Sequence, residues 1–277
     1  MQLLEHFKEL TLHPKNAEEL KGLILQLAVQ GKLTRQWREE NPDVEPASVL
    51  LKKIESEKEK LVKRKKIKKE KPLSNIQEAE IPYSLPNSWE WCRLGHSGYT
   101  QTGSTPPKND STNYGDHIPF IGPGDISNQW MKYPIEGLSE KGIEVGRLIP
   151  KGSLMMVCIG GSIGKCNINE VDVSCNQQIN TITPVLIPSY FIKTVCQAPF
   201  FQNEVWEKSS GSATPIINKG KWENIVIPLP PFEEQKSIVE KVNALMTLCD
   251  KLEQEIETHQ TTQEEWMQSC LRGVIEN

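Results

Sequence analysis

A long stretch without helix breakers near the C-terminal end limits the folds open to this chain. Residues 232–272 contain no glycine or proline, and their apolar positions recur in alternating steps of four and three. Such a heptad stripe predicts one continuous helix packed against another helix. At about 1.5 Å per residue it is on the order of 60 Å long. The stripe therefore needs a partner helix, from this chain or from a second copy.

The stripe also predicts a surface for self-association. Its polar positions are His259 and Gln263, after which it reaches Trp266 and Cys270. Polar seam residues commonly fix the register or the partner of a coiled coil. The apolar positions that we expect to make the oligomer contact are Ile238, Val242, Leu245, Cys249, Leu252 and Ile256.

A second amphipathic helix is expected at residues 17–33. Its apolar positions, spaced three and four apart, are Leu20, Leu23, Ile24, Leu27 and Ala28. Asn16 is a suitable N-cap for this helix, and Gly31 is a natural stop. A surface helix that packs only on its own domain would show the same pattern, so the sequence leaves its packing partner open.

Positive charge is concentrated in one segment. Residues 52–71 hold eleven Lys or Arg and four Glu, whereas the whole chain carries a net charge of −4. A run of this kind is usually a solvated and partly disordered face. The alternative is an arm that binds nucleic-acid phosphates without reading sequence. Pro72 ends the run.

The middle of the chain predicts a mixed domain of about 150 residues. Short apolar runs flanked by Gly, Pro, Asn and Asp indicate strands at 118–121, 154–159, 179–187 and 225–229. Residues 188–208 look helical, with a break near Pro199. We predict an α+β chain in three parts: a helical segment with its Lys-rich arm (1–72), a mixed domain (73–231) and a long coiled-coil helix (232–277).

Cysteine and histidine spacing gives no support for a metal site. The seven cysteines are odd in number and contain no C-x-x-C pair, and the five histidines are scattered. The N-terminus lacks the pattern of a signal peptide, and no window reaches 18 apolar residues. These features predict a cytoplasmic protein that does not span a membrane and holds no metal.

The sequence lacks the motifs of several enzyme classes. The glycine turn at 160–166 has Ile159 where a phosphate-binding loop needs its first glycine, and Cys166 follows Lys165 in place of Ser or Thr. Hydrolase, zinc-protease and deaminase patterns do not occur. Leu229 precedes Pro230-Pro231-Phe232 where amino-methyltransferases carry Asn or Asp. We therefore predict no catalytic residues.

The segment Leu229-Pro230-Pro231-Phe232-Glu233-Glu234-Gln235, which leads straight into the heptad helix, resembles the junction found in type I restriction–modification specificity subunits. Residues 24–33 resemble that family's other helical segment. Weaker matches to its recognition domains lie at Thr102-Gly103-Ser104-Thr105-Pro106, at the glycine turn that begins at Gly160 and at Cys175-Asn176-Gln177-Gln178. The resemblance covers roughly residues 15–277.

Members of that family carry two recognition domains, whereas only one is evident in this sequence. The resemblance implies a half-size subunit, or a fragment, that reads one half-site in double-stranded DNA. It also implies partners: modification subunits that carry S-adenosylmethionine, restriction subunits that use ATP and Mg, and a second copy paired through long antiparallel helices. This chain itself would hold no cofactor. A two-fold assembly predicts an interrupted palindrome as the target.

Base readout favours side chains whose paired donors and acceptors match base edges. We expect DNA contacts from polar residues in or near glycine-containing loops: Ser104, Thr105, Lys108, Ser162, Lys165, Asn176, Gln177, Gln178, Lys219 and Lys221. The amides at 176–178 can equally serve to tie loops together, and the lysines suit phosphate contacts better than base contacts.

Two other functions stay open at this point. The chain could be a non-catalytic interaction protein or a decoy that mimics DNA, because the residues outside the Lys-rich run are strongly acidic. An acidic concave face would favour the decoy, and a basic one would favour the DNA reader. The central domain could also be an enzyme of another kind, which a buried cluster of titratable residues would indicate.

Overall fold

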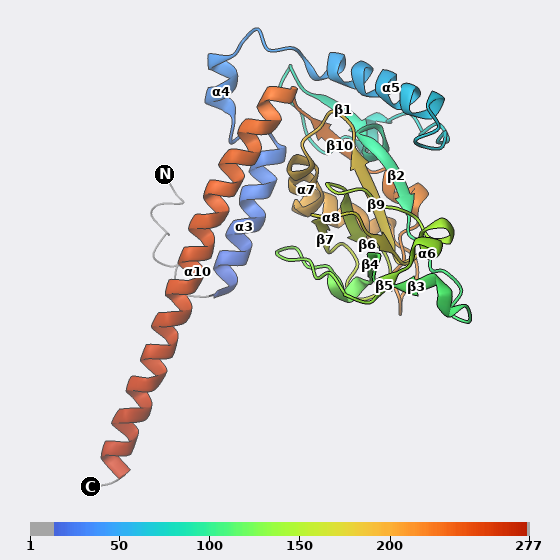
Figure 1. Ribbon diagram of the computed structural model, residues 1–277. Helices are drawn as coiled ribbons and strands as arrows, with labels where there is room; N and C mark the ends of the chain where they lie inside the picture. Colours follow the sequence, from blue (N-terminus) through green and yellow to red (C-terminus); the bar gives the residue numbers. More distant parts are fainter. Residues whose placement is uncertain (1–13, 276–277) are drawn as a thin grey trace.

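Two antiparallel helices lie side by side along one side of a body of short strands and helices in the computed structural model, which describes residues 14–275 (Figure 1). The helices are α3 (Pro14–Val29), α4 (Arg35–Glu40), α5 (Ala47–Lys63), α6 (Glu140–Val145), α7 (Ser189–Gln197), α8 (Pro199–Lys208), α9 (Lys219–Glu223) and α10 (Phe232–Ile275). The prediction of an α+β chain with one mixed domain and a long C-terminal helix is confirmed.

The strands are short and belong to two sheets and a ribbon. They are β1 (Glu90–Arg93), β2 (Gly98–Thr102), β3 (Tyr114–Gly115), β4 (Ile118–Ile121), β5 (Gly137–Leu138), β6 (Leu154–Val157), β7 (Cys166–Ile168), β8 (Ser174–Cys175), β9 (Ile179–Pro184) and β10 (Val226–Leu229). The four expected strands are all present, three of them shorter than predicted. The expected helical break at Pro199 separates α7 from α8.

The main sheet is antiparallel, with the order β2-β9-β6-β7. Its centre is fully apolar, since all four residues of β6 are buried. One side packs on α7, where Phe191, Ile192 and Val195 are buried. The second sheet, β3-β5-β4-β8, shares a smaller core with the main sheet around Ile121 and Val157. β1 and β10 form a two-stranded ribbon in which Glu90 lies opposite Leu229, so the domain begins and ends at one place.

Helix α3 differs from the sequence prediction at its start and agrees with it at its end. It begins at Pro14, so Asn16 lies inside the helix and is not its N-cap. Proline suits a first helical turn because its missing N–H has no partner there. The helix ends at Val29, and Gly31 adopts a φ of +70°. That left-handed conformation closes the helix and favours glycine.

The heptad stripe of α10 packs against α3 of the same chain. Ile238, Val242 and Cys249 are buried in the main core, with Leu245 packed beside them. Lys21 of α3 pairs with Asp250 at 2.7 Å and Glu253 at 2.6 Å, which fixes the antiparallel register. The partner helix that the stripe requires is therefore supplied within the chain over this part of α10.

The far end of α10 projects away from the body (Figure 1). Its side chains at Trp266 and Met267 are 73% and 53% exposed. The side chains of His259, Gln263 and Cys270 lie outside the part of the structure that is described. No helix within residues 14–275 combines the length and the apolar character needed to cross a bilayer.

Candidate nucleic-acid interface

One end of the main sheet gathers most of the polar loops singled out in the sequence. β2 ends at Thr102 opposite Asn180 at the start of β9, and β6 ends at Val157 opposite Ile179. Four loops meet at this end, which we call the rim: residues 103–108, 158–165, 175–178 and 209–217. Antiparallel pairing puts the end of one strand beside the start of its neighbour, which is why loops distant in sequence converge here.

The first and third of these loops are joined directly. The backbone N–H of Ser104 donates to Cys175 O at 2.9 Å, and Thr105 Oγ1 donates to Gln177 Oε1 at 2.7 Å. Gly103 permits this approach, because a Cβ there would lie 2.1 Å from Asn176 O. Ser104, Thr105 and Gln177 are thus placed side by side, with Gln177 exposed.

Asn176 and Gln178 are held by one another. The backbone N–H of Gln178 donates to Asn176 Oδ1 at 2.9 Å, and Asn176 Nδ2 donates to Gln178 Oε1 at 3.2 Å. These two amides therefore shape their own turn, whereas Gln177 is the amide that ties this loop to residues 103–108. Gln177 between them stays available at the surface, and it is the strongest candidate of the three for contact with a base.

The turn between β6 and β7 contains Ser162 and Lys165. Gly160 and Gly164 adopt φ values of +86° and +89°, which confirms the expected tight glycine turn. Cys158 N donates to Gln178 O at 2.8 Å, and Gly160 N donates to Pro215 O at 2.9 Å. The turn therefore lies between the amide cluster and the 209–217 loop, with the Lys165 side chain exposed at the rim.

The structure does not place Lys219 and Lys221 with the other candidates. The ammonium group of Lys219 donates to Thr100 Oγ1 at 2.8 Å and forms an ion pair with Glu223. Lys221 Nζ donates to the backbone oxygen of Lys208 at 3.0 Å. Both side chains hold α9 against its neighbours, so their use as DNA contacts requires these bonds to be exchanged.

The loop that carries Lys108 is fixed by several local bonds. Tyr114 donates through its hydroxyl to Pro106 O at 2.7 Å, and Lys141 Nζ lies 2.9 Å from Asp110 Oδ2. Hydrogen bonds from Thr112 and Lys141 lower the pKa of Asp110 to about 2. The loop is thus ordered before any ligand arrives, which reduces the entropy cost of binding.

A shallow hollow of about 730 Å³ opens beside this loop. It is lined by Thr105, Lys108, Tyr114, Gly115, Asp116, Phe120, Ile135, Glu136 and Gly137. Lys108 supplies a cation, whereas Asp116 and Glu136 supply hydrogen-bond acceptors, so the surface is neither uniformly basic nor uniformly acidic. Reading bases needs both donors and acceptors, because guanine offers acceptors and cytosine a donor in the major groove.

Sequence reasoning missed Arg147. Its Nη1 donates to Thr102 O at 2.5 Å, directly before the 103–108 loop, and its side chain is exposed. The sequence carried no signal for this contact, because the two residues are 45 positions apart and Arg147 lies in an ordinary loop. Ile135, which lines the hollow and is 87% exposed, was also missed, because an isoleucine in a sequence is ordinarily expected to be buried.

The junction between the domain and the helices centres on Glu234. This carboxylate is fully buried and accepts hydrogen bonds from Thr34 Oγ1 at 2.7 Å and Trp89 Nε1 at 2.7 Å. Arg38 forms an ion pair with it. Glu234 lies in the first turn of α10, where the positive end of the helix dipole favours a negative charge. The proline-to-helix motif is thus a joint that fixes the domain on the helix pair.

A second buried charge holds the linker that follows the Lys-rich run. Arg93 is 2% exposed, and it donates to Glu80 and to the backbone oxygens of Ser74 and Asn75. Its hydrogen bonds lower the pKa of Glu80 to about 2. This arrangement keeps residues 74–80 close to the body, so that the Lys-rich run is tethered at both ends.

Comparison with known proteins assigns the chain to a family. A model of the type I restriction modification DNA specificity domain matches residues 86–259. The EcoAI specificity subunit of a type I restriction enzyme from Escherichia coli is 34% identical over 95% of this chain and 45% of its own length. The EcoEI specificity subunit, also from Escherichia coli, is 31% identical over 94% of this chain and 44% of its own length.

Solved structures share the fold at lower identity. A chain from the structural work "Structural basis underlying complex assembly and conformational transition of the type I R-M system" superposes with a TM-score of 0.57, at 20% identity, over 69% of this chain and 46% of that one. The HsdS subunit from Thermoanaerobacter tengcongensis gives 0.50, at 19% identity, over 64% and 44%. The chain spans about half the length of the curated relatives that it matches. It belongs to the type I restriction–modification DNA specificity family.

Proposed function

We propose that this chain reads one half of an interrupted target in duplex DNA and carries out no chemistry itself. The convergence of four loops on one rim is the observation that carries this proposal. The rim presents Thr105 bonded to Gln177 and carries the exposed Lys165 on another of its loops, and Thr105 also lines a hollow that offers both donors and acceptors. Base edges in the major groove are told apart by such mixed patterns.

The target bases would be methylated or cut by other subunits. The relatives are named as specificity subunits of type I restriction enzymes. By that likeness, modification subunits would bring S-adenosylmethionine, and restriction subunits would bring ATP and Mg. This chain would select the site and recruit both.

Two copies of the chain would complete the site through the free end of α10. The stripe from Ile238 to Cys249 already packs on α3, so the predicted oligomer surface is occupied within the chain there. Past Ile256, α10 projects with Trp266 exposed, and that end is the surface available to a second copy. Two antiparallel helices of about 66 Å would hold two domains at least one turn of DNA apart, roughly 34–36 Å.

Methylation mapping tests the proposal as a whole. Genomic DNA is compared between cells that carry the gene with its companion modification subunits and cells in which the gene has an early stop codon. We expect methylated adenines at an interrupted palindrome only in the first strain. Identical methylation in both strains, with the protein and its companions present in the first, would contradict the proposal.

A further inference from the structure

The Lys-rich run has an ordered form along the body of the domain. Residues 64–71 follow α5 and carry six cationic side chains, which we call the cationic strip: Arg64, Lys65, Lys66, Lys68, Lys69 and Lys71. All six are exposed, whereas the two other residues, Ile67 and Glu70, are partly buried. The segment therefore has one face toward the domain and one cationic face toward solvent.

Glu70 anchors the strip to the edge of the main sheet. Glu70 Oε1 accepts from the backbone N–H of Thr100 at 3.0 Å, and Glu70 Oε2 pairs with Lys58 at 2.8 Å. Lys58 also donates to the backbone oxygens of Gly95 and Gly98 at 2.7 Å. β2 is an edge strand, so the Thr100 amide would otherwise lack a partner. The strip thus covers an exposed edge while its lysines point outward.

The six cations have no acidic partner in the part of the chain that the structure describes. None of them lies within 4.0 Å of a carboxylate there, although Lys53 and Lys60 on the neighbouring α5 pair with Glu45 and Glu57. Neighbouring like charges repel, and an anion that bridges them relieves the repulsion. The geometry keeps the six charges together in a protein whose remaining residues are net acidic.

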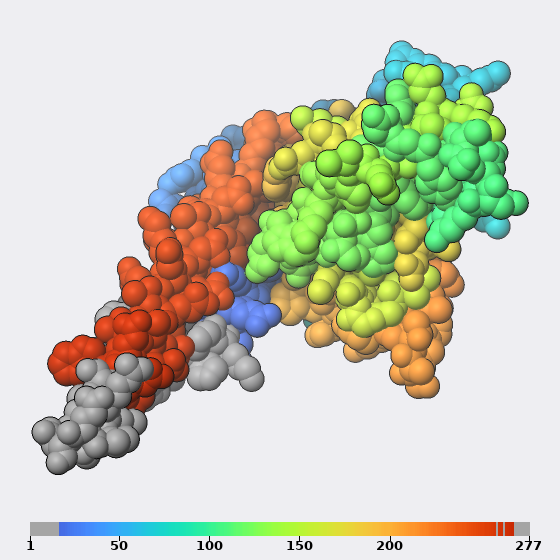
Figure 2. All heavy atoms as spheres, turned by 60° about the horizontal axis from the view of Figure 1, so that its bottom comes forward, coloured from blue at the N-terminus to red at the C-terminus, as the bar shows by residue number. Residues whose placement is uncertain are grey.

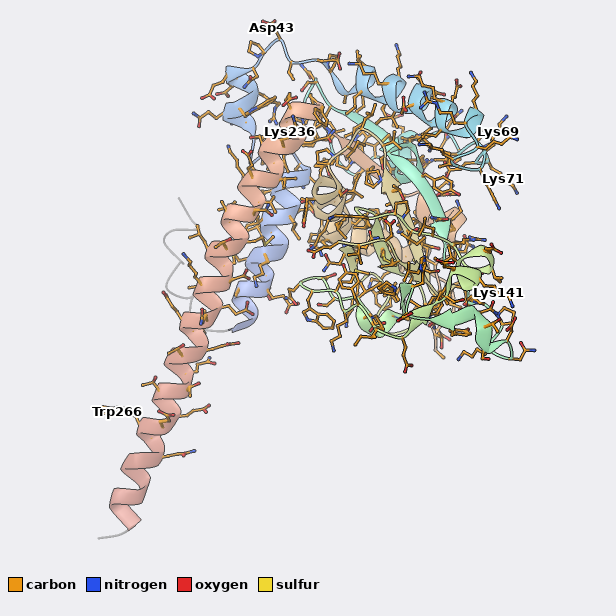
Figure 3. All side chains as sticks on the ribbon, viewed as in Figure 1. Asp43, Lys69, Lys71, Lys141, Lys236 and Trp266 are labelled. Atoms are coloured by element: carbon orange, nitrogen blue, oxygen red, sulfur yellow. The ribbon has the colours of Figure 1, made fainter. Side chains whose placement is uncertain are left out.

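The strip lies next to the rim. Glu70 is fixed at Thr100, and β2 leads from there to the 103–108 loop within three residues, or about 10 Å. Arg147 sits between the two, bonded to Thr102 O. A hollow of about 590 Å³ separates the strip from Gln101 and Leu148. Figure 2 shows the strip, in cyan, beside the green surface of residues around 100–145. Figure 3 shows Lys69 and Lys71 reaching outward on the side away from α10.

We propose that the cationic strip binds the phosphate backbone of duplex DNA beside the bases that the rim reads. This inference rests on the proposed function. Duplex DNA carries about one negative charge per 1.7 Å of axis, so several exposed cations on one face can each meet a phosphate. Phosphate contacts set the orientation of a protein on DNA without specifying sequence. The strip therefore gives affinity and alignment, and the rim gives selectivity.

Salt-dependent binding of the full chain to DNA tests the proposal. The strip variant is Lys68→Ala, Lys69→Ala and Lys71→Ala, and the control with the same change of charge is Lys236→Ala, Lys241→Ala and Lys251→Ala on α10. The probe is a random-sequence duplex titrated at several salt concentrations. We expect the strip variant to bind at least about tenfold more weakly at low salt, with the slope of log K against log salt reduced by roughly two to three. The control variant should change neither the affinity at low salt nor the slope by a comparable amount.

A second pair of variants tests the anchor. Glu70→Ala and Glu59→Ala each remove one negative charge, but only Glu70 holds the strip on β2. We expect Glu70→Ala to bind the duplex more weakly than Glu59→Ala. If it binds as tightly or more tightly, net charge alone matters and the anchored arrangement is wrong.

The remaining outcomes separate this inference from the proposed function. If the wild-type chain binds the duplex and the strip variant shows an unchanged slope, the inference is overturned while the proposed function stands. Loss of association with modification subunits, with DNA binding unchanged, would instead show an acidic protein as the partner of the strip. If the wild-type chain with its modification subunits binds no DNA, the proposed function itself fails.

Discussion

Trp89 Nε1 donates a 2.7 Å hydrogen bond to Glu234 Oε2, across 145 positions of sequence. Trp89 precedes the first strand of the domain, and Glu234 lies in the first turn of α10. The same carboxylate also accepts a hydrogen bond from Thr34, which lies just after α3. One buried side chain therefore connects the start of the domain with both long helices, and it fixes the angle at which the domain is held.

Replacing Glu234 by Gln should destabilise the chain. The change removes the charge that Arg38 and the α10 N-terminus face, and Glu234 is fully buried. Breaking one side of a buried pair costs about 3–5 kcal/mol, and roughly half of that is expected here because Arg38 is partly exposed. Urea unfolding measures it. Glu233→Gln is the control: that side chain is exposed, and its change should stay within about 0.5 kcal/mol. Equal effects for the two would refute the role of the joint.

Acid should weaken the Glu80–Arg93 contact in a defined window. Arg93 lowers the pKa of Glu80 from 4.5 to about 2. The contribution of the Glu80–Arg93 contact to stability is therefore fully present above pH 4.5. It is lost as the pH falls from about 4.5 toward 2, because the folded state must then bind a proton that the unfolded state binds more readily. The free energy of unfolding of wild type minus that of Glu80→Gln should shrink over this window. A difference that is independent of pH would contradict the assignment.

A methyl group at Gly103 should disrupt the rim. The added Cβ would lie 2.1 Å from Asn176 O and 2.4 Å from Cys175 O, which are backbone atoms that cannot turn aside. We expect Gly103→Ala to cost about 1–3 kcal/mol and to reduce binding to target DNA. At Gly124, which lies outside the rim, a Cβ meets nothing within 4 Å, so Gly124→Ala serves as the control. Thermal unfolding and DNA binding of the two variants decide the matter.

Gln177 should contribute to selectivity more than to general affinity. Its side chain is exposed at the rim and bonded only to Thr105 among the described contacts. If it reads a base, Gln177→Ala should relax one position of the methylated sequence, at a cost of about 1–3 kcal/mol for the original base. Methylation mapping of the variant measures this. The control is Gln36→Ala, which removes an exposed amide on α4 and should leave the methylated sequence unchanged. An unchanged methylated sequence for Gln177→Ala as well would show that Gln177 does not read a base.

Trp266 should matter for self-association, and Leu248 should not. Both are exposed apolar residues of α10. Trp266 lies on the projecting end (Figure 3), whereas Leu248 lies close in sequence to Asp250, which pairs with Lys21 of α3. We expect Trp266→Ala to lower the mass found by light scattering at a given concentration, while Leu248→Ala keeps it. Leu245→Asp should instead reduce stability, because Leu245 packs against the core within the chain. A wild-type chain that stays monomeric at high concentration would contradict the proposed dimer.

The sequence predicted the long helix and its junction well because both follow from local pattern. A heptad stripe without glycine or proline admits few alternatives, and the strand at 118–121 has the predicted bounds. β2 escaped prediction because its residues, Gly98 to Thr102, are mostly polar and are covered by Glu70 of the Lys-rich segment and by α9. Its burial is a tertiary effect that periodicity does not record.

The candidate site was predicted in part, for a related reason. The two glycine loops were found because tight turns need particular residues, and the structure brings both of them to the amide segment 175–178. Lys219 and Lys221 were selected by residue type, yet the structure gives both ammonium groups intramolecular partners. Arg147 was passed over because its position depends on a contact with Thr102 that only the folded chain creates. Residue type suggests which chemistry is available, and the fold decides which side chains are free to use it.

The ribbon of β1 and β10 makes the recognition domain exchangeable as a unit. Because Glu90 lies opposite Leu229, the chain enters and leaves the domain side by side. Everything between them could be replaced by another domain with the same paired ends, and the contacts of Glu234 with Thr34 and Arg38 would remain as they are. If the domain reads DNA as proposed, exchange of such a cassette changes the sequence that is read, while the frame that positions the domain stays intact.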